Sequence, residues 1–302
     1  MTYDGTCLGI CYSDSQLYYS AGSPGNPAEA QHIGSFDFNF NVKEAIVNGR
    51  TEAFAGIERS ISDLKEKFNC TSVRILAPAD EECWTVLPRA VYENSDEREA
   101  HIRILAHSSP REDLRITWFR MSNMDQRLLL IRKNSAMEGF NRLLGGIHRT
   151  EYLSEFEIGS EWQQHTQING SFLTICCSRN HITISSFLLG KLRGAVILRF
   201  DQKNDLPYFW KLYSNIHSWM SGIHEQVYFY GYDARAVRDI LTPFWDRSGE
   251  YIVMDSLGQM QITAGEETYG FPLEHAFPAI LLSLNFDQQP TEELHENHNG
   301  NS

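Results

Sequence analysis

The sequence lacks the features that would place the protein in a membrane or direct it out of the cell. In its 302 residues no apolar run reaches the ~18 residues that a transmembrane helix needs. Its first residues show no basic segment followed by an apolar one, so we expect no signal peptide. These absences predict a protein of the cytoplasm that is not an integral membrane protein.

Metal-ligand spacings are also missing. Among six cysteines, Cys7 and Cys11 are separated by three residues, while Cys176 and Cys177 are adjacent, and neither spacing is usual for zinc. Buried structural thiols are the favoured interpretation, and a metal or redox role is the alternative. The histidines form no His-x3-His pair beside an acid, so we predict no metal site.

Basic residues are outnumbered by acidic ones, and the net charge is −13. A nucleic acid needs a cationic face for its phosphates, so we predict no nucleic-acid partner. The segment from Arg111 to Lys133 is the one candidate basic patch, but its charges alternate with strand residues and fit solvated strand edges.

No strong catalytic motif occurs. The chain has no Gly-x-Ser-x-Gly elbow, no P-loop and no Gly-x-Gly-x-x-Gly. Whether the protein is an enzyme is therefore left open, with the balance toward no. An enzyme of another class that uses the histidines or cysteines is one alternative.

The clearest pattern that is present lies between Asn169 and Phe200. β-Branched enrichment, alternating polarity and short polar connections there predict a three-stranded meander. A helix, a strand and a second helix are expected to follow, over residues 206–221, 226–230 and 233–244, then a final strand at 251–254 and a short helix at 279–284.

The N-terminal half repeats this order. Three strands are predicted at 6–10, 17–21 and 32–40, then a helix at 48–68 and a strand at 72–77. Further along we predict a strand at 81–87, a helical turn at 88–92, a helix at 96–104, a hairpin of 115–120 with 126–133, a helix at 135–144, a strand at 147–158 and an exposed link at 161–169.

Two halves with one order suggest an internal duplication. We therefore predict an α/β fold with mixed sheets and two lobes, residues 1–160 and 161–286. The tail from 287 to 302 is almost free of apolar residues and is predicted to be disordered.

Four short segments carry a resemblance to a known fold. They are Leu8 to Ile10 before a tight turn, Val73 to Leu76 followed by residues 85–88, the hairpin from Leu173 to Gly190, and Val227 to Tyr232 before a helix. The chain resembles the actin-like, Hsp70-like ATPase fold (ASKHA, ribonuclease H-like) and, within it, the bacterial family of unknown function DUF 3822. That family looks related in architecture to the pilus-assembly protein PilM and the cytoplasmic domain of GspL.

The resemblance implies a nucleotide cleft with two phosphate loops that carry glycines and an acid to orient Mg²⁺, and a third loop for adenosine. In this chain the cleft positions are occupied by Cys11, Ser13, Asp14, Cys176, Ser178, Arg179 and Gly231. Most of the expected acids and glycines are missing, so we predict a degenerate cleft and no cofactor, with Mg-ATP as the alternative.

Individual cleft residues admit two interpretations. Asp14 is either a turn-former at a hairpin tip or a substitute for the missing acid. Arg179 and His181 either lie in a solvated turn or contact an anion.

Aromatic side chains are dense in the helix expected at 206–221. Burial against the second sheet explains most of them, and a partner-binding surface formed by Trp210, Tyr213 and Trp219 is the alternative. The predicted function is a non-catalytic scaffold that binds an unidentified protein, its oligomeric state open. The alternative is an active ATPase or sugar kinase with atypical phosphate loops.

Overall fold

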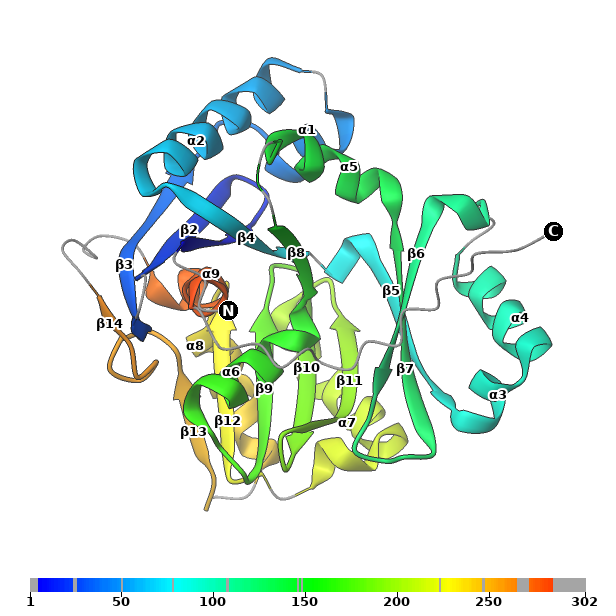
Figure 1. Ribbon diagram of the computed structural model, residues 1–302. Helices are drawn as coiled ribbons and strands as arrows, with labels where there is room; N and C mark the ends of the chain where they lie inside the picture. The colour runs from blue at the N-terminus through cyan, green and yellow to red at the C-terminus, as the bar shows by residue number, and fades with distance from the viewer. Residues whose placement is uncertain are drawn as a thin grey trace.

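Two large β-sheets and a smaller one organise the chain in a computed structural model (Figure 1). The structure describes residues 5–23, 26–49, 51–77, 79–106, 109–145, 147, 149–222, 224–245, 248–264 and 272–284. The mixed α/β class expected from the sequence is confirmed.

The first sheet has six strands in the order β14-β3-β2-β1-β4-β8. Its first three strands form the antiparallel meander that alternating polarity predicts, and β4 and β8 add in parallel on the other side of β1. The strands are β1 (Thr6–Tyr12), β2 (Gln16–Ser23), β3 (Asn26–Asp37), β4 (Cys70–Ala77), β8 (Arg149–Ser154) and β14 (Thr263–Ala264).

Helices α1 (Val42–Asn48), α2 (Glu52–Phe68) and α5 (Asn134–Leu143) pack with the first sheet around one apolar core. The single helix predicted for 48–68 was wrong at its start, because the chain forms two helices there. Gly49 ends α1 in the left-handed region at φ 60°, and the Thr51 hydroxyl accepts the Phe54 N–H to begin α2. We call the first sheet and these helices the first lobe.

The second sheet has the order β11-β10-β9-β12-β13 and contains the meander predicted between Asn169 and Phe200. Helices α7 and α8 cover one face of it, over a core of aliphatic and aromatic side chains. We call this sheet with α7 and α8 the second lobe. Its elements are β9 (Ser171–Cys177), β10 (His181–Leu188), β11 (Lys191–Arg199), α7 (Leu206–Ile216), β12 (Gln226–Gly231), α8 (Ala234–Leu241) and β13 (Glu250–Val253).

A third sheet, in the order β5-β7-β6, is inserted between β4 and β8. Its hairpin was predicted correctly, and two short helices cover its outer face. The elements are β5 (Glu82–Pro88), α3 (Arg89–Glu93), α4 (Ser95–Leu105), β6 (Leu114–Arg120) and β7 (Gln126–Lys133).

Helix α9 (Leu273–Ser283) lies against both large sheets, in contact with β1, β2 and β12. It starts six residues before the predicted 279, and its residues from Ala276 to Ser283 are buried. Its approach to the first sheet depends on two glycines: a Cβ at Gly9 would lie 1.9 Å from the Ala279 oxygen, and one at Gly22 would lie 2.0 Å from the Ser283 oxygen.

The segment after β8 corrects the sequence analysis. A strand to Ile158 and an exposed link at 161–169 were expected, but β8 ends at Ser154 and a turn (Glu155–Glu157) leads into α6 (Ile158–Thr166). Ser154 and Glu157 form a capping box, and Trp162 of α6 is 1% exposed. The Ser-x-x-Glu capping motif at residues 154–157 therefore indicates the structure of this segment better than its strand-like pattern of apolar residues does.

Two further predictions concern the division into lobes and the C-terminal tail. The division into lobes at residues 1–160 and 161–286 stays a prediction, although β14 and α9 both come from the second of these ranges and lie on the first sheet. The predicted disordered tail, 287–302, lies outside the described residues. Among the described residues no helix is long and apolar enough to span a bilayer.

Candidate functional site

The two turns predicted as phosphate loops meet across the space between the lobes. Asp14, in the β1–β2 turn, has a carboxylate oxygen 3.9 Å from the Arg179 guanidinium, in the β9–β10 turn. Asp14 also lies 3.8 Å from the Lys43 ammonium. The carboxylate that could replace a missing magnesium ligand is therefore placed between two cations of the chain itself.

Each turn is closed by a backbone hydrogen bond. The Ser13 N–H donates to the Gln16 oxygen at 2.8 Å, and the Ser178 N–H donates to the His181 oxygen at 2.9 Å. These bonds direct the two N–H groups back into their own turns and away from the space between the hairpins. That arrangement fits the turn-forming interpretation of both segments.

Tyr232 lies beside the contact between the turns. Gly231 precedes it at φ 91°, and a Cβ at Gly231 would come 2.3 Å from the Cys177 oxygen, so only glycine fits there. The Tyr232 ring receives the Arg179 guanidinium at 5.3 Å and the Lys203 ammonium at 5.1 Å from its centroid. Lys203 also pairs with Asp233. Arg179 and Lys203 thus each contact the Tyr232 ring and pair with a carboxylate.

Two of the predicted cleft positions hold neutral, buried groups. Cys11 and Cys176 are the next-to-last residues of β1 and β9 and are 5% and 6% exposed. Burial raises the pKa of the Cys11 thiol to about 12 and raises that of Cys176 well above its usual value, so both thiols stay protonated at neutral pH. A metal ligand needs the thiolate, so these cysteines fit the structural interpretation.

His275, at the start of α9, contacts Cys11 and the neighbouring Tyr18. Its Nδ1 lies 3.0 Å from the Tyr18 hydroxyl, and its backbone oxygen accepts the Cys11 thiol at 3.4 Å. Burial lowers the pKa of the His275 imidazole, so the ring is neutral near pH 7.

Glu155 was missed by the sequence analysis. Its side chain is buried beneath the β9–β10 turn, where the Thr183 hydroxyl donates to it at 2.5 Å and the His181 imidazole lies 3.7 Å away. His181 is 2% exposed, so the expectation that it lies in a solvated turn was wrong. No sequence motif marks Glu155; only the neighbouring capping box would have drawn attention to its segment.

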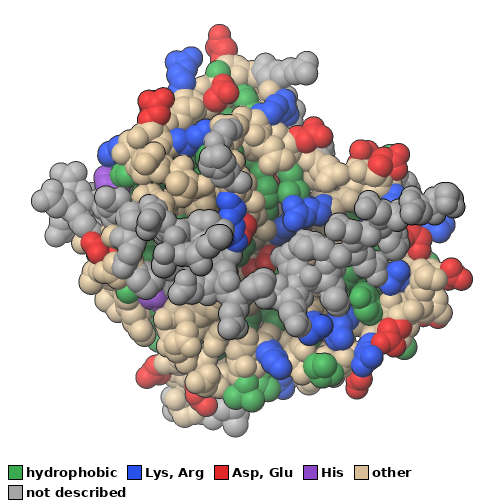
Figure 2. All heavy atoms as spheres, viewed as in Figure 1, with side chains coloured by type: hydrophobic (Ala, Val, Ile, Leu, Met, Phe, Trp, Pro, Cys, Tyr) green, Lys and Arg blue, Asp and Glu red, His purple; other side chains and the backbone are tan. Residues whose placement is uncertain are grey.

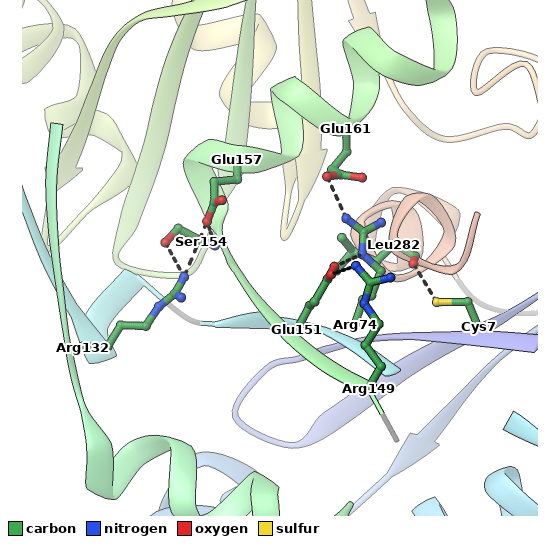
Figure 3. Close-up of polar contacts among 9 residues, drawn as sticks. All are labelled: Cys7, Arg74, Arg132, Arg149, Glu151, Ser154, Glu157, Glu161 and Leu282. Carbon is green, nitrogen blue, oxygen red and sulfur yellow. Dashed lines mark hydrogen bonds and ion pairs between the residues drawn. The ribbon is translucent and has the colours of Figure 1, made fainter. Parts of the chain in front are cut away.

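A second polar cluster lies further along β8 (Figure 3). The Arg74 guanidinium pairs with Glu161 of α6 at 2.7 Å and with Glu151 of β8 at 2.9 Å, and Arg149 pairs with Glu151. Figure 2 shows basic and acidic side chains close together at the centre of the face it draws. Because Arg74 and Glu161 are almost fully buried, this cluster fixes α6 to the first sheet.

Figure 3 also draws Arg132 of β7 and some of its partners. It donates to Glu82, to the Ser154 hydroxyl at 2.8 Å and to the Tyr152 oxygen at 3.0 Å. Beside it is a cavity of about 20 Å³, lined by Glu82, Tyr12 and Tyr152 among others, which has room for one water molecule. The cluster is structural, and among the described residues no group of three or more His, Cys, Asp or Glu could hold a metal.

The predicted partner surface is wrong in one of its members. Trp210 is 2% exposed and packs edge-on against Trp245 at 4.8 Å, because it lies on the face of α7 that meets the second sheet. Tyr213 and Trp219 are half-buried against the same core. The exposed apolar side chains of α7 recur every fourth residue instead: Tyr208 (66%), Leu212 (42%) and Ile216 (65%).

Solved structures identify the class of fold. A Bacteroides thetaiotaomicron protein with an actin-like ATPase fold and unknown function is 14% identical over 83% of this chain and 91% of that one, with a TM-score of 0.52. The PilM–PilN type IV pilus biogenesis complex contains a chain 11% identical over 94% of this chain and 98% of that one, with a TM-score of 0.61. The cytoplasmic domain of EpsL from Vibrio cholerae is 9% identical over 85% of this chain and 93% of that one, with a TM-score of 0.47.

The protein therefore has the actin-like two-lobe ATPase fold, as the sequence predicted. At these identities the likeness shows the fold alone. No family model matches the chain and no curated protein matches it, so membership of DUF 3822 stays a prediction.

Proposed function

We propose that the protein is a non-catalytic, actin-like scaffold that binds another protein and has a degenerate nucleotide cleft. The observation that carries this proposal is the contact of Asp14 with Arg179 between the two turns where the fold would hold a triphosphate. A metal-bound triphosphate would have to displace this ion pair. It would also meet the Tyr232 ring, with its two cations, beside it.

The electrostatics support the same conclusion. Magnesium in such clefts is held through carboxylates together with phosphates. Here the strand-end positions are the protonated thiols Cys11 and Cys176, and Asp14 is already paired with Arg179 and Lys43. The cleft supplies neither a free acid nor glycine N–H groups at these loops.

The protein-binding half of the proposal rests on the fold. PilM, whose complex with PilN contains a similar chain, acts in an assembly, and we propose that this chain likewise binds an unidentified protein. We also propose a cytoplasmic location, supported by the six cysteines, all of which are free thiols. Two lobes, 1–160 and 161–286, are the proposed domains.

Mg-ATP binding tests the degenerate cleft. We expect no rise in melting temperature with Mg-ATP and no heat in titration calorimetry, because the ion pair and the ring occupy the site. A nucleotide present at 100 times its Kd would stabilise the fold by about 2.7 kcal/mol, so binding would be visible. A rise in melting temperature that Mg-ATP causes in the native protein, and that is lost in a Tyr232→Trp variant with a bulkier ring, would contradict the proposal.

A second function, an active ATPase or sugar kinase, is favoured by one observation. Glu155 is a buried carboxylate beneath the β9–β10 turn and adds to the rise in the Cys176 pKa. If this function holds, ATP turnover would be measurable and would be lost in Asp14→Ala and Glu155→Gln. Asp239→Ala, at an exposed position of α8, is the matched control.

A further inference from the structure

The central strand of the third sheet, β7, is buried on both faces. Leu128 and Leu130 of β7 are fully buried and point to the central core that both lobes share, whereas Leu129 and Ile131 point to α3 and α4. This alternation has the period of two that a strand between two apolar layers requires. The third sheet therefore packs against the body of the protein as tightly as a core element.

One end of the third sheet is fixed to the first lobe. Arg132 of β7 donates to the Ser154 hydroxyl and to the Tyr152 backbone oxygen, both in β8, and lies 3.5 Å from the Glu157 carboxylate (Figure 3). Arg132 is 6% exposed, and Glu82 of β5 pairs with it. Breaking a buried pair of this kind is costly, so this end does not detach easily.

The other end of the third sheet is fixed to the second lobe. In the β6–β7 turn the Ser122 N–H donates to the Leu192 oxygen of β11 at 2.7 Å. Met121, beside it, is 2% exposed and belongs to the same core as Leu192 and Phe187. Because β11 is the edge strand of the second sheet, this turn meets an edge that no strand of the described chain pairs with.

Between these two ends an aromatic contact reinforces the connection. Phe156 lies edge-on to Trp84 of β5 at 5.1 Å and to Phe119 of β6 at 5.2 Å. Phe156 is 1% exposed and lies in the segment that leads from β8 into α6, where the chain passes from one lobe to the other.

We infer that the third sheet is a bridge that holds the two lobes together in the arrangement seen here. From Gln126 to Arg132, β7 extends about 20 Å at the rise of a strand, and its two ends are fixed to different lobes. Two-lobe proteins open by a hinge, and this hinge cannot open unless the β6–β7 turn leaves β11. Separation of Asp14 from Arg179 is therefore coupled to detachment of that turn. The inference does not depend on whether a nucleotide binds.

Two methionines of the β6–β7 turn provide a matched pair of variants. Met121 is 2% exposed and Met124 is 56% exposed. Met121→Gln buries an amide against the core and should shift the equilibrium toward the detached turn, whereas Met124→Gln leaves its side chain in water.

Hydrogen exchange measured by mass spectrometry is the readout, since exchange follows the population of the open form. In Met121→Gln we expect on the order of tenfold faster exchange in β11 and, at a distance, in the turns at residues 13–16 and 178–181. Met124→Gln should exchange like the native protein. Faster exchange confined to residues 121–126, or native exchange in β11, would overturn the inference.

A second pair of variants tests the bridge independently, in case Met121→Gln has a folding defect. Ser122→Pro removes the N–H donor to Leu192, and Ser122→Ala keeps it. Faster exchange at residues 178–181 in Ser122→Pro but not in Ser122→Ala supports the bridge. Equal exchange at those residues in both variants contradicts it.

Discussion

The pKa values of several buried side chains in this protein are shifted by burial more than by neighbouring charge. Cys11, Cys176 and Tyr230 all have raised pKa values with burial as the largest cause, and each is held in its neutral form. Buried histidines shift the other way for the same reason. The two thiols at the ends of β1 and β9 are consequently uncharged at neutral pH.

His224 gives the clearest consequence for pH. Burial lowers the pKa of its imidazole from 6.5 to about 4, while the ring contacts the Trp219 oxygen at 2.9 Å and the Ser171 hydroxyl at 3.3 Å. Below pH 6.5 the unfolded chain takes up this proton and the folded chain does not until about pH 4, so stability falls as pH falls through that window. The loss from this group is about 3 kcal/mol.

Urea denaturation at pH 7.5 and pH 5 measures about 2 kcal/mol of this loss, because pH 5 lies inside the window. His165, His217 and His275 have pKa values shifted in the same direction and add to the slope. In His224→Gln, which has no titrating ring, the difference in the free energy of unfolding between the two pH values should shrink. An unchanged difference would show that His224 titrates normally in the fold.

At the scale of elements, most strands could be predicted because alternation and β-branched residues are local signals. Both meanders and the β6–β7 hairpin are confirmed, with ends that differ by a few residues. α6 was missed because its polar sequence, which includes Gln163, Gln164 and His165, resembles a link. Only its N-terminal cap and the burial of Trp162 distinguish it from a loop.

The capping box that leads into α6 should contribute more to the free energy of unfolding than an ordinary N-cap does. The Ser154 hydroxyl accepts both a backbone N–H of the capping box and the Arg132 guanidinium, so Ser154→Ala loses the cap and leaves a buried donor unmet. We expect a cost of about 2–3 kcal/mol in the free energy of unfolding.

Thr51→Ala is the matched control, since Thr51 caps α2 at an exposed position. Its loss should cost about 1 kcal/mol. Chemical denaturation of both variants decides the comparison, and equal costs would mean that the Arg132 bond adds nothing.

At the scale of the whole molecule, buried ion pairs and α9 connect parts that are distant in sequence. Arg74 of the first sheet pairs with Glu161 of α6, with side chains 7% and 10% exposed. Helix α9 lies against β1 and β12, one strand from each large sheet. These contacts make the two lobes one body in the arrangement seen here.

Removing one partner of the Arg74 pair should therefore be costly. Arg74→Met leaves Glu161 buried without its cation and should lower the free energy of unfolding by about 3–5 kcal/mol. Adding Glu161→Leu should recover most of the loss, because two apolar side chains can replace a buried ion pair.

Arg89→Met tests the contrast with an exposed pair. Arg89 and Glu93 are about half exposed, so this variant should have little effect on the free energy of unfolding. Denaturation of the native protein and these three variants gives the comparison. A small effect of Arg74→Met would show that water reaches Glu161.

The turns that meet at the candidate site could be predicted from the sequence, but the contacts of their side chains could not. The resemblance placed Asp14, Arg179 and Gly231 at the ends of strands, and the structure brings these turns together. It could not indicate that Asp14 pairs with Arg179, that Tyr232 receives two cations, or that Glu155 lies beneath them, since these depend on side-chain packing across lobes.

The sequence by itself determined the strands, the hairpins and most of the helices, because periodic burial and turn residues act between near neighbours. Tertiary structure alone decided that Trp210 is core, that α9 lies between the sheets and that the third sheet contacts both lobes. The physical reason is that a contact between distant segments depends on which apolar faces pack against each other. Sequences with the same local pattern can pack these faces in different ways.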